Sequence, residues 1–121
     1  MDKFIIKDSH PNISRLEKLF LEEGVLTKFK KNEYLVRQNE KTNQIGFIMS
    51  GMFRLSHIDA DTNEWIVGYS FVNDFVCDYP SFIKQATSTV NIQATTECEV
   101  YLLSLNHVCR DIPTLIRFLL R

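Results

Sequence analysis

The feature that most constrains the fold of this chain is a double change in the spacing of its apolar residues. Near the N-terminus they recur at helical spacing, from Lys28 onward they alternate with polar residues in short runs, and after Ser104 helical spacing returns. Alternation with a period of two places successive side chains on opposite faces of a strand. The pattern therefore predicts a mainly β domain, an antiparallel β-roll or jelly roll with flanking helices.

The alternating region can be divided into strands at its polar turns. Ile45, Phe47 and Met49 are expected to share one face of a strand. The polar residues 59–63 predict a turn, and therefore a hairpin between the strand before them and the strand after them. Residues 95–97 predict another turn. The strands on either side of the second turn are indicated by Val90, Ile92 and Ala94 and by Cys98, Val100 and Leu102.

Helices are predicted on both sides of the strands. Residues 9–11 offer a cap and an early proline for a first helix, which Gly24 ends. A short helix is expected over residues 105–110, and Asp111 and Pro113 favour the start of a further one. We expect the apolar stripe of this last helix to pair two subunits. The stripe consists of Ile112, Leu115, Ile116 and Leu119.

Length and charge exclude several classes of protein. A chain of 121 residues with a 45% hydrophobic share should form one packed domain. The formal net charge is −1 and no basic stripe is present, so this chain alone is not expected to bind DNA. No segment approaches the roughly 18 apolar residues of a membrane span, which favours a cytoplasmic location. Residues 118–121 end without a helix cap, so we expect a longer parent protein.

Five segments of the chain carry motifs of one known protein family. Residues 29–40 and 47–55 are similar to that family's first strands, and residues 61–64 resemble its aspartate-glycine-lysine-glutamate hairpin. Residues 73–76 resemble the run before its ligand-binding cassette, and residues 97–101 match its cysteine-glutamate-valine strand. Together these segments resemble the cyclic-nucleotide-binding β-roll of Crp/Fnr-type transcription regulators, and the resemblance covers nearly the whole chain. It implies one sensory domain over the full length, 1–121, with DNA binding assigned to a C-terminal domain absent from this chain.

Three asparagines stand where this family favours glycine. They are Asn32, Asn39 and Asn73. Asparagine is the other residue that tolerates a positive φ, so we expect these substitutions to preserve the turns.

The resemblance also implies which residues would touch a ligand. In the family, a glutamate holds the ribose hydroxyl and an arginine pairs with the cyclic phosphate; aligned without gaps, Asp78 and Ser88 take these positions. A hydrogen bond to a charged group contributes about 1.5–3 kcal/mol, so loss of the arginine predicts at least about tenfold weaker binding. Usual cyclic AMP binding is therefore not expected. The candidate ligand-binding residues are the cassette positions Cys77, Asp78, Tyr79, Ser88 and Thr89.

Each cassette residue also has a purely structural explanation. Asp78 is expected to cap a helix before Pro80, and Tyr79 and Phe82 are expected to pack as wall or core aromatics. Lys84 could replace the missing cation, although a lysine on a helix is more often solvated. If a ligand binds, these aromatic walls suggest that it is less anionic than a cyclic nucleotide. The alternative is that the pocket is vestigial.

Enzymatic and cofactor chemistry find little support. A metal-dependent enzyme of the same jelly-roll shape needs clustered histidines and a glutamate on adjacent strands, whereas the histidines here are isolated in sequence. We therefore expect no catalytic residues, no metal and no cofactor. The odd number and wide spacing of the cysteines predict reduced, packed thiols. The histidines are His10, His57 and His107, and the cysteines are Cys77, Cys98 and Cys109.

The sequence thus favours the effector-sensing or scaffolding domain of a Crp/Fnr-type regulator, acting as a homodimer with a possible small-molecule effector. The alternative is a dimerisation or protein-interaction module of β-roll fold with a vestigial pocket.

Overall fold

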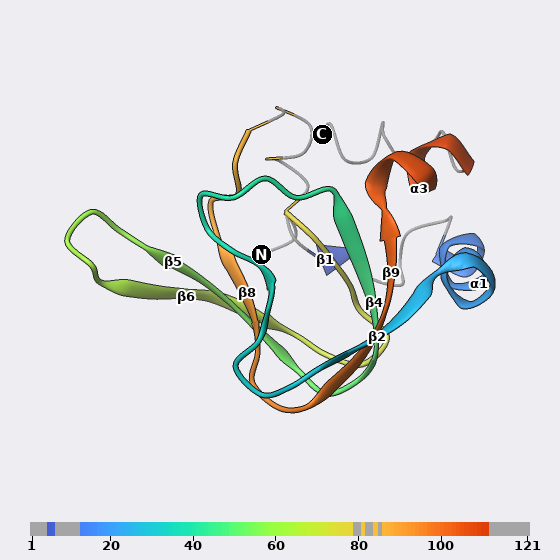
Figure 1. Cartoon of the computed structure of the whole chain (residues 1–121), viewed down its shortest axis with the longest axis horizontal. Helices are drawn as coiled ribbons and strands as arrows, with labels where there is room; N and C mark the ends of the chain where they lie inside the picture. Colours follow the sequence, from blue (N-terminus) through green and yellow to red (C-terminus); the bar gives the residue numbers. More distant parts are fainter. Residues whose placement is uncertain (1–4, 7–12, 79–80, 82–83, 85, 112–121) are drawn as a thin grey trace.

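The computed structural model describes residues 5–6, 13–78, 81, 84 and 86–111. In this part of the chain two antiparallel sheets lie together, and helices α1 and α3 lie beside the sheet that contains β4 and β9 (Figure 1). The helices are α1 (Ile13–Glu23) and α3 (Leu105–Asp111). The strands are β1 (Ile5–Ile6), β2 (Val25–Phe29), β3 (Tyr34–Val36), β4 (Gln44–Ser50), β5 (Phe53–Ile58), β6 (Glu64–Ser70), β7 (Phe75–Val76), β8 (Asn91–Ala94) and β9 (Cys98–Ser104).

The strand order confirms the predicted antiparallel roll. One sheet has the order β1-β7-β4-β9-β2 and the other has the order β3-β8-β5-β6. Strands that follow each other in sequence lie in different sheets at several points, so the chain repeatedly crosses between the two layers. The chain does not cross between β5 and β6, because the two arms of this hairpin pair directly from Phe53 with Ser70 to Ile58 with Glu64.

The helices are confirmed where they are described. Leu16 and Phe20 of α1 are fully buried, and the N–H of Gly24 donates to the carbonyl of Phe20 at 2.9 Å where the helix ends. The predicted cap at residues 9–11 and the predicted stripe over residues 112–119 lie outside the described residues. No helix in the described part of the chain is long and apolar enough to cross a membrane.

Helices α1 and α3 pack on the five-stranded sheet and enclose what we call the outer core. Phe47 and Phe75 stack with their ring centroids 4.5 Å apart, and Phe20 meets Phe75 edge-on at 5.2 Å. Such aromatic pairs contribute about 0.5–1.5 kcal/mol beyond the area they bury. The outer core consists of Leu16, Leu19, Phe20, Ile45, Phe47, Phe75, Cys77, Leu103, Leu105 and Val108.

A second cluster, the inner core, fills the space between the two sheets. Both β4 and β9 contribute to each core, because their successive side chains point to opposite faces and both faces are covered. These strands are therefore the shared wall of the fold. The inner core consists of Val36, Ile48, Phe53, Leu55, Val76, Val90, Ile92, Ala94, Cys98 and Val100.

Met49 of β4 does not join Ile45 and Phe47 in the outer core. Ile45 and Phe47 share the outer core as expected, but Met49 is 38% exposed while Ile48 is fully buried in the inner core. The pairing of β4 with β9 shifts register between Ile48 and Ser50. A bulge of this kind adds one residue to a strand and breaks the alternation of faces, which explains the exposure.

The asparagine turns are confirmed. Asn32, Asn39 and Asn73 adopt φ angles of 75°, 71° and 72°. The N–H of Asn73 donates to the carbonyl of Ile48 at 2.8 Å, so this turn holds the segment before β7 against β4. Thr62 in the β5–β6 turn also has a positive φ, of 65°.

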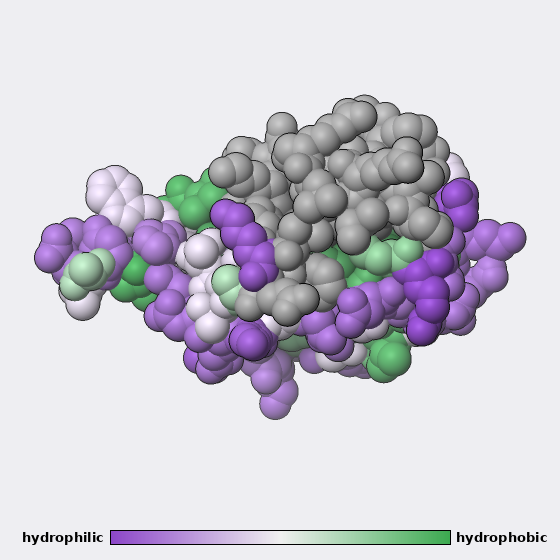
Figure 2. Space-filling model, turned by 90° about the horizontal axis from the view of Figure 1, so that it is seen from above, coloured by the Kyte–Doolittle hydropathy of each residue, from purple (hydrophilic) through white to green (hydrophobic). Residues whose placement is uncertain are grey.

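The β5–β6 hairpin projects from the body of the domain (Figure 1). Figure 2 shows apolar side chains on this projecting part, and β6 is an edge strand. At the turn, Asp59 accepts hydrogen bonds from Trp65 Nε1–H (2.8 Å) and from the N–H groups of Asn63 and Asp61. These bonds, that of Trp65 first, hold the pKa of Asp59 below its usual value. The exposed apolar residues of the hairpin and of the segment after it are Ile58, Trp65, Ile66, Tyr69, Phe71 and Val72.

Replacement of Asn73 tests the role of its positive φ. We expect Asn73→Ala to lower the free energy of unfolding by about 1 kcal/mol, because a Cβ-bearing residue without a short polar side chain is strained in the left-handed region. Asn73→Gly should be close to neutral, since glycine has no such strain. Urea unfolding followed by circular dichroism measures both. Equal losses for the two variants would contradict a backbone origin.

Candidate functional site

The candidate site lies between the end of β7 and the start of β8. Asp78 follows β7 after one residue and has no exposed surface, and Ser88 shortly before β8 is 1% exposed. The two side chains meet, because Ser88 Oγ lies 2.8 Å from Asp78 Oδ2. The residues at the glutamate and arginine positions of the sequence comparison are therefore hydrogen-bond partners.

Asp78 is held by further donors from both sides of the cassette. The N–H and Oγ of Ser81 lie 3.1 Å from Oδ1 and 2.8 Å from Oδ2 of Asp78. The N–H of Thr89 donates to Oδ2 at 2.9 Å, and Thr89 Oγ1 lies 3.4 Å away. Among the described residues all of these donors are neutral. Several hydrogen bonds from neutral groups are the usual way to stabilise a buried carboxylate that lacks a cation.

The Ser88 hydroxyl has a second acceptor nearby. Its Oγ lies 2.8 Å from the carbonyl oxygen of Val90 as well as from Asp78 Oδ2, and one proton serves both. A charged carboxylate is the stronger acceptor. The backbone of Ser88 is fixed independently, since its N–H donates to the carbonyl of Glu40 (2.9 Å) and its carbonyl accepts from the N–H of Asn39 (2.8 Å).

Thr89, just before β8, is fixed by a contact with β5, the strand that pairs with β8. Nδ1 of His57, on β5, lies 2.8 Å from the carbonyl oxygen of Thr89. A carbonyl can only accept, so this ring nitrogen carries the proton. Thr89 therefore joins Asp78 to β5.

The structure supports the capping role that the sequence predicted for Asp78. Its Oδ1 accepts from the N–H three residues further on, that of Ser81, which is the bond an N-cap residue makes. Ser81 was missed as a member of the site. The available signal was its spacing, because a serine three residues after an aspartate can also return a hydroxyl to that aspartate. Pro80 and Phe82 lie outside the described residues.

The remaining cassette residues do not join this cluster in the described part of the chain. Cys77 points into the outer core, where burial, with a smaller contribution from the Asp78 carboxylate, raises the pKa of its thiol well above the usual value. Burial also raises the pKa of the Cys109 thiol. Lys84 is exposed, and Tyr79 lies outside the described residues.

The cysteines are free, as the sequence predicted. Cys77 and Cys98 are buried and Cys109 is partly buried. A thiol with a raised pKa is protonated and unreactive near neutral pH, so Cys77 and Cys109 serve packing.

Comparison with known families identifies the fold. A family model described as "Cyclic nucleotide-binding domain" matches residues 26–110. The matched region contains Asp78 and its hydrogen-bond partners Ser81, Ser88 and Thr89. A comparison with curated proteins finds no match.

Solved structures with the same fold come from bacteria and from protozoa. The sensor domain of the transcriptional regulator DNR from Pseudomonas aeruginosa has a TM-score of 0.73 and 17% identity over 88% of this chain and 73% of that chain. A regulatory subunit of a cAMP-independent protein kinase A from Trypanosoma cruzi, bound to guanosine, has a TM-score of 0.73 and 23% identity over 88% of this chain and 38% of that chain.

A third similar structure is the c-di-GMP responsive global regulator CLP from Xanthomonas campestris. It has a TM-score of 0.71 and 19% identity, over 86% of this chain and 54% of that chain. The present chain thus spans about half of CLP and well under half of the kinase subunit. At these identities the likeness shows the fold.

Removal of the Asp78 carboxylate tests the cluster. We expect Asp78→Ala to lower the free energy of unfolding by about 3 kcal/mol, because the donors of Ser81, Ser88 and Thr89 lose their buried acceptor. The control is Asp61→Ala, which removes an exposed carboxylate in the β5–β6 turn and should change stability by less than about 0.5 kcal/mol. Urea unfolding measures both. Similar small effects in the two variants would contradict the cluster.

Proposed function

The chain belongs to the cyclic nucleotide-binding domain family, and we propose that it is an effector-sensing or scaffolding domain of a Crp/Fnr-type transcription regulator that does not bind cyclic AMP in the usual way. The regulator part of the proposal is supported by DNR and CLP, which share the fold and are named as transcriptional or global regulators. The ligand part is carried by one observation, the hydrogen bond between Asp78 and Ser88.

This hydrogen bond opposes the usual ligand in two ways. Ser88 offers no positive charge to a cyclic phosphate, and its hydroxyl already lies against Asp78 and the carbonyl of Val90. The Asp78 carboxylate would repel a phosphate brought near it, and the repulsion is stronger inside a protein than in water. The loss of a charged partner alone accounts for at least about a tenfold decrease in affinity.

We propose that an effector of this domain is a small molecule with little or no negative charge. A ligand of this kind gains nothing from the missing arginine and suffers no repulsion from Asp78. The proposal is supported by the similar kinase subunit from Trypanosoma cruzi, which is bound to guanosine, a nucleoside without phosphate. The candidate contacts are the cassette positions Cys77, Asp78, Tyr79, Ser88 and Thr89, of which Cys77 contributes through packing.

We further propose that the chain acts in the cytoplasm as part of a longer homodimeric protein. Its own net charge of −1 gives it no means of holding DNA phosphates, so DNA binding would belong to a separate domain, and the role of this domain would be regulatory and not catalytic. The proposed dimer contacts follow α3 directly but lie outside the described residues. They are Ile112, Leu115, Ile116 and Leu119.

A dimerisation or protein-interaction module with a vestigial pocket is the second candidate. It is favoured by the same hydrogen bonds around Asp78, because a cluster that satisfies its own polar groups needs no ligand. The residues that follow Arg121 in the gene distinguish the two candidates, since a basic helix-turn-helix would support the regulator.

Calorimetric titration tests the ligand proposal. We expect no heat of binding with millimolar cyclic AMP or cyclic GMP, because Ser88 stands at the position of the phosphate-binding arginine. Guanosine serves as the uncharged comparison, and tighter binding of guanosine than of either cyclic nucleotide is the expected order. Micromolar affinity for cyclic AMP would overturn the proposal.

Sedimentation tests the dimer proposal. We expect the chain, extended by the residues that follow Arg121, to sediment as a dimer, and we expect Leu115→Asp to convert it to a monomer because a charge is introduced into the apolar stripe. The control is Leu21→Asp, at a leucine of α1 that is already 49% exposed. A monomer at high concentration, or equal dissociation by both substitutions, would contradict the proposed interface.

A further inference from the structure

A cluster of three metal-ligating side chains joins α1 to α3, away from the cassette. Nε2 of His107 lies 3.0 Å from Oε1 of Glu23 and 3.5 Å from Oδ2 of Asp111. Ligand atoms of all three residues lie within 4.8 Å of one another. His107 and Asp111 are four residues apart on α3 and so share a helix face, and Glu23 is the last residue of α1.

The spacing of these atoms suits a transition metal. Bonds of 2.0–2.1 Å in a tetrahedral zinc site place neighbouring ligand atoms about 3.3 Å apart. The two distances from His107 Nε2, 3.0 Å and 3.5 Å, lie on either side of this value. The side chains of Glu23 and Asp111 are 50% and 39% exposed, so they have room to rotate toward a shared ion.

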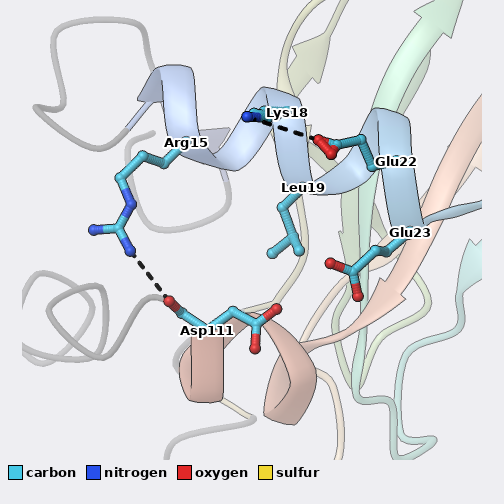
Figure 3. A pocket seen from close by; sticks show the side chains of 6 residues that line it. All are labelled: Arg15, Lys18, Leu19, Glu22, Glu23 and Asp111. Carbon is cyan, nitrogen blue, oxygen red and sulfur yellow. Dashed lines mark hydrogen bonds and ion pairs between the residues drawn. The ribbon is translucent and has the colours of Figure 1, made fainter.

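The surroundings of the cluster leave the two carboxylates available. Figure 3 shows Glu23 and Asp111 facing the same hollow between α1 and α3, a space of about 320 Å³. The cations that line it have other contacts: Arg15 Nη2 donates to the backbone carbonyl of Asp111 at 3.2 Å, and Lys18 pairs with Glu22 at 4.0 Å. The formal charges of the residues that line the hollow sum to −1.

We propose that Glu23, His107 and Asp111 form a three-ligand site for a divalent transition metal of the Zn²⁺ type. An imidazole nitrogen with two carboxylates suits zinc, whereas calcium requires six to eight oxygen ligands. The metal bonds to Nε2 of His107 and to one oxygen of each carboxylate, and water completes the coordination. Because Glu23 ends α1 and Asp111 ends α3, a bound ion ties the first helix to the helix that precedes residues 112–121.

The sequence predicted no metal centre because its histidines are isolated. The fold changes this conclusion for His107, since it brings together residues 84 positions apart in the chain. His57 is not part of the cluster.

Titration with Zn²⁺ and Co²⁺ tests the site, using the whole chain freed of metal by a chelator. We expect saturable binding of one ion per chain, a higher melting temperature with Zn²⁺, and the visible absorption of low-coordinate Co²⁺. His107→Gln and Glu23→Gln should each weaken binding by at least about tenfold, because changes even beyond the direct ligands cost this much in metal sites. Melting of each metal-free variant shows whether it is folded.

Glu22→Gln is the matched control, since it removes the neighbouring carboxylate that also lines the hollow but does not belong to the cluster. It should keep the affinity of the unaltered chain. Absence of Zn²⁺ binding at millimolar concentration would overturn the proposal, and so would equal affinities of the unaltered chain and His107→Gln. A loss in Glu22→Gln as large as that in Glu23→Gln would also overturn it, because diffuse surface charge would then explain the binding.

Discussion

A carboxylate with no exposed surface must find its hydrogen-bond donors inside the protein, and the arrangement of the cassette depends on how Asp78 meets this requirement. One donor residue, Ser81, follows Asp78 by three positions, and the other two, Ser88 and Thr89, lie just before β8. The segments that leave β7 and enter β8 are thereby held against one acceptor. The Thr89 carbonyl extends the same network to His57 on β5.

The hydrogen bonds that Asp78 accepts inside the protein have a direct consequence for ligand recognition. In the family that the chain resembles, the corresponding two positions face a ligand, one toward ribose and the other toward phosphate. Here Asp78 and Ser88 face each other and carry no positive charge between them. A cyclic nucleotide would have to separate a satisfied pair and place its phosphate beside a carboxylate. We therefore propose that the chain shares the fold of nucleotide sensors but not their usual ligand.

The sequence predicted much of the architecture and less of the site. Alternation located the strands, and the asparagine turns followed from the limited set of residues that accept a positive φ, as Asn73 shows. The exposure of Met49 could not be predicted, because the bulge in β4 depends on its pairing with β9. The bond between Asp78 and Ser88 spans ten residues, and the contact of Glu23 with His107 spans 84. Local sequence patterns do not reveal contacts between residues that are this far apart in the chain.

We propose that Asp78 is engaged by the cassette itself and is not available to a cyclic nucleotide. The ¹H–¹⁵N spectrum of the backbone amides of Ser81 and Thr89, recorded with hydrogen exchange and without and with millimolar cyclic AMP, tests this proposal. We expect both amides, which donate to Asp78, to be protected from exchange and not to shift when the nucleotide is added. Rapid exchange in the free protein, or saturable shifts of these amides with cyclic AMP, would contradict it.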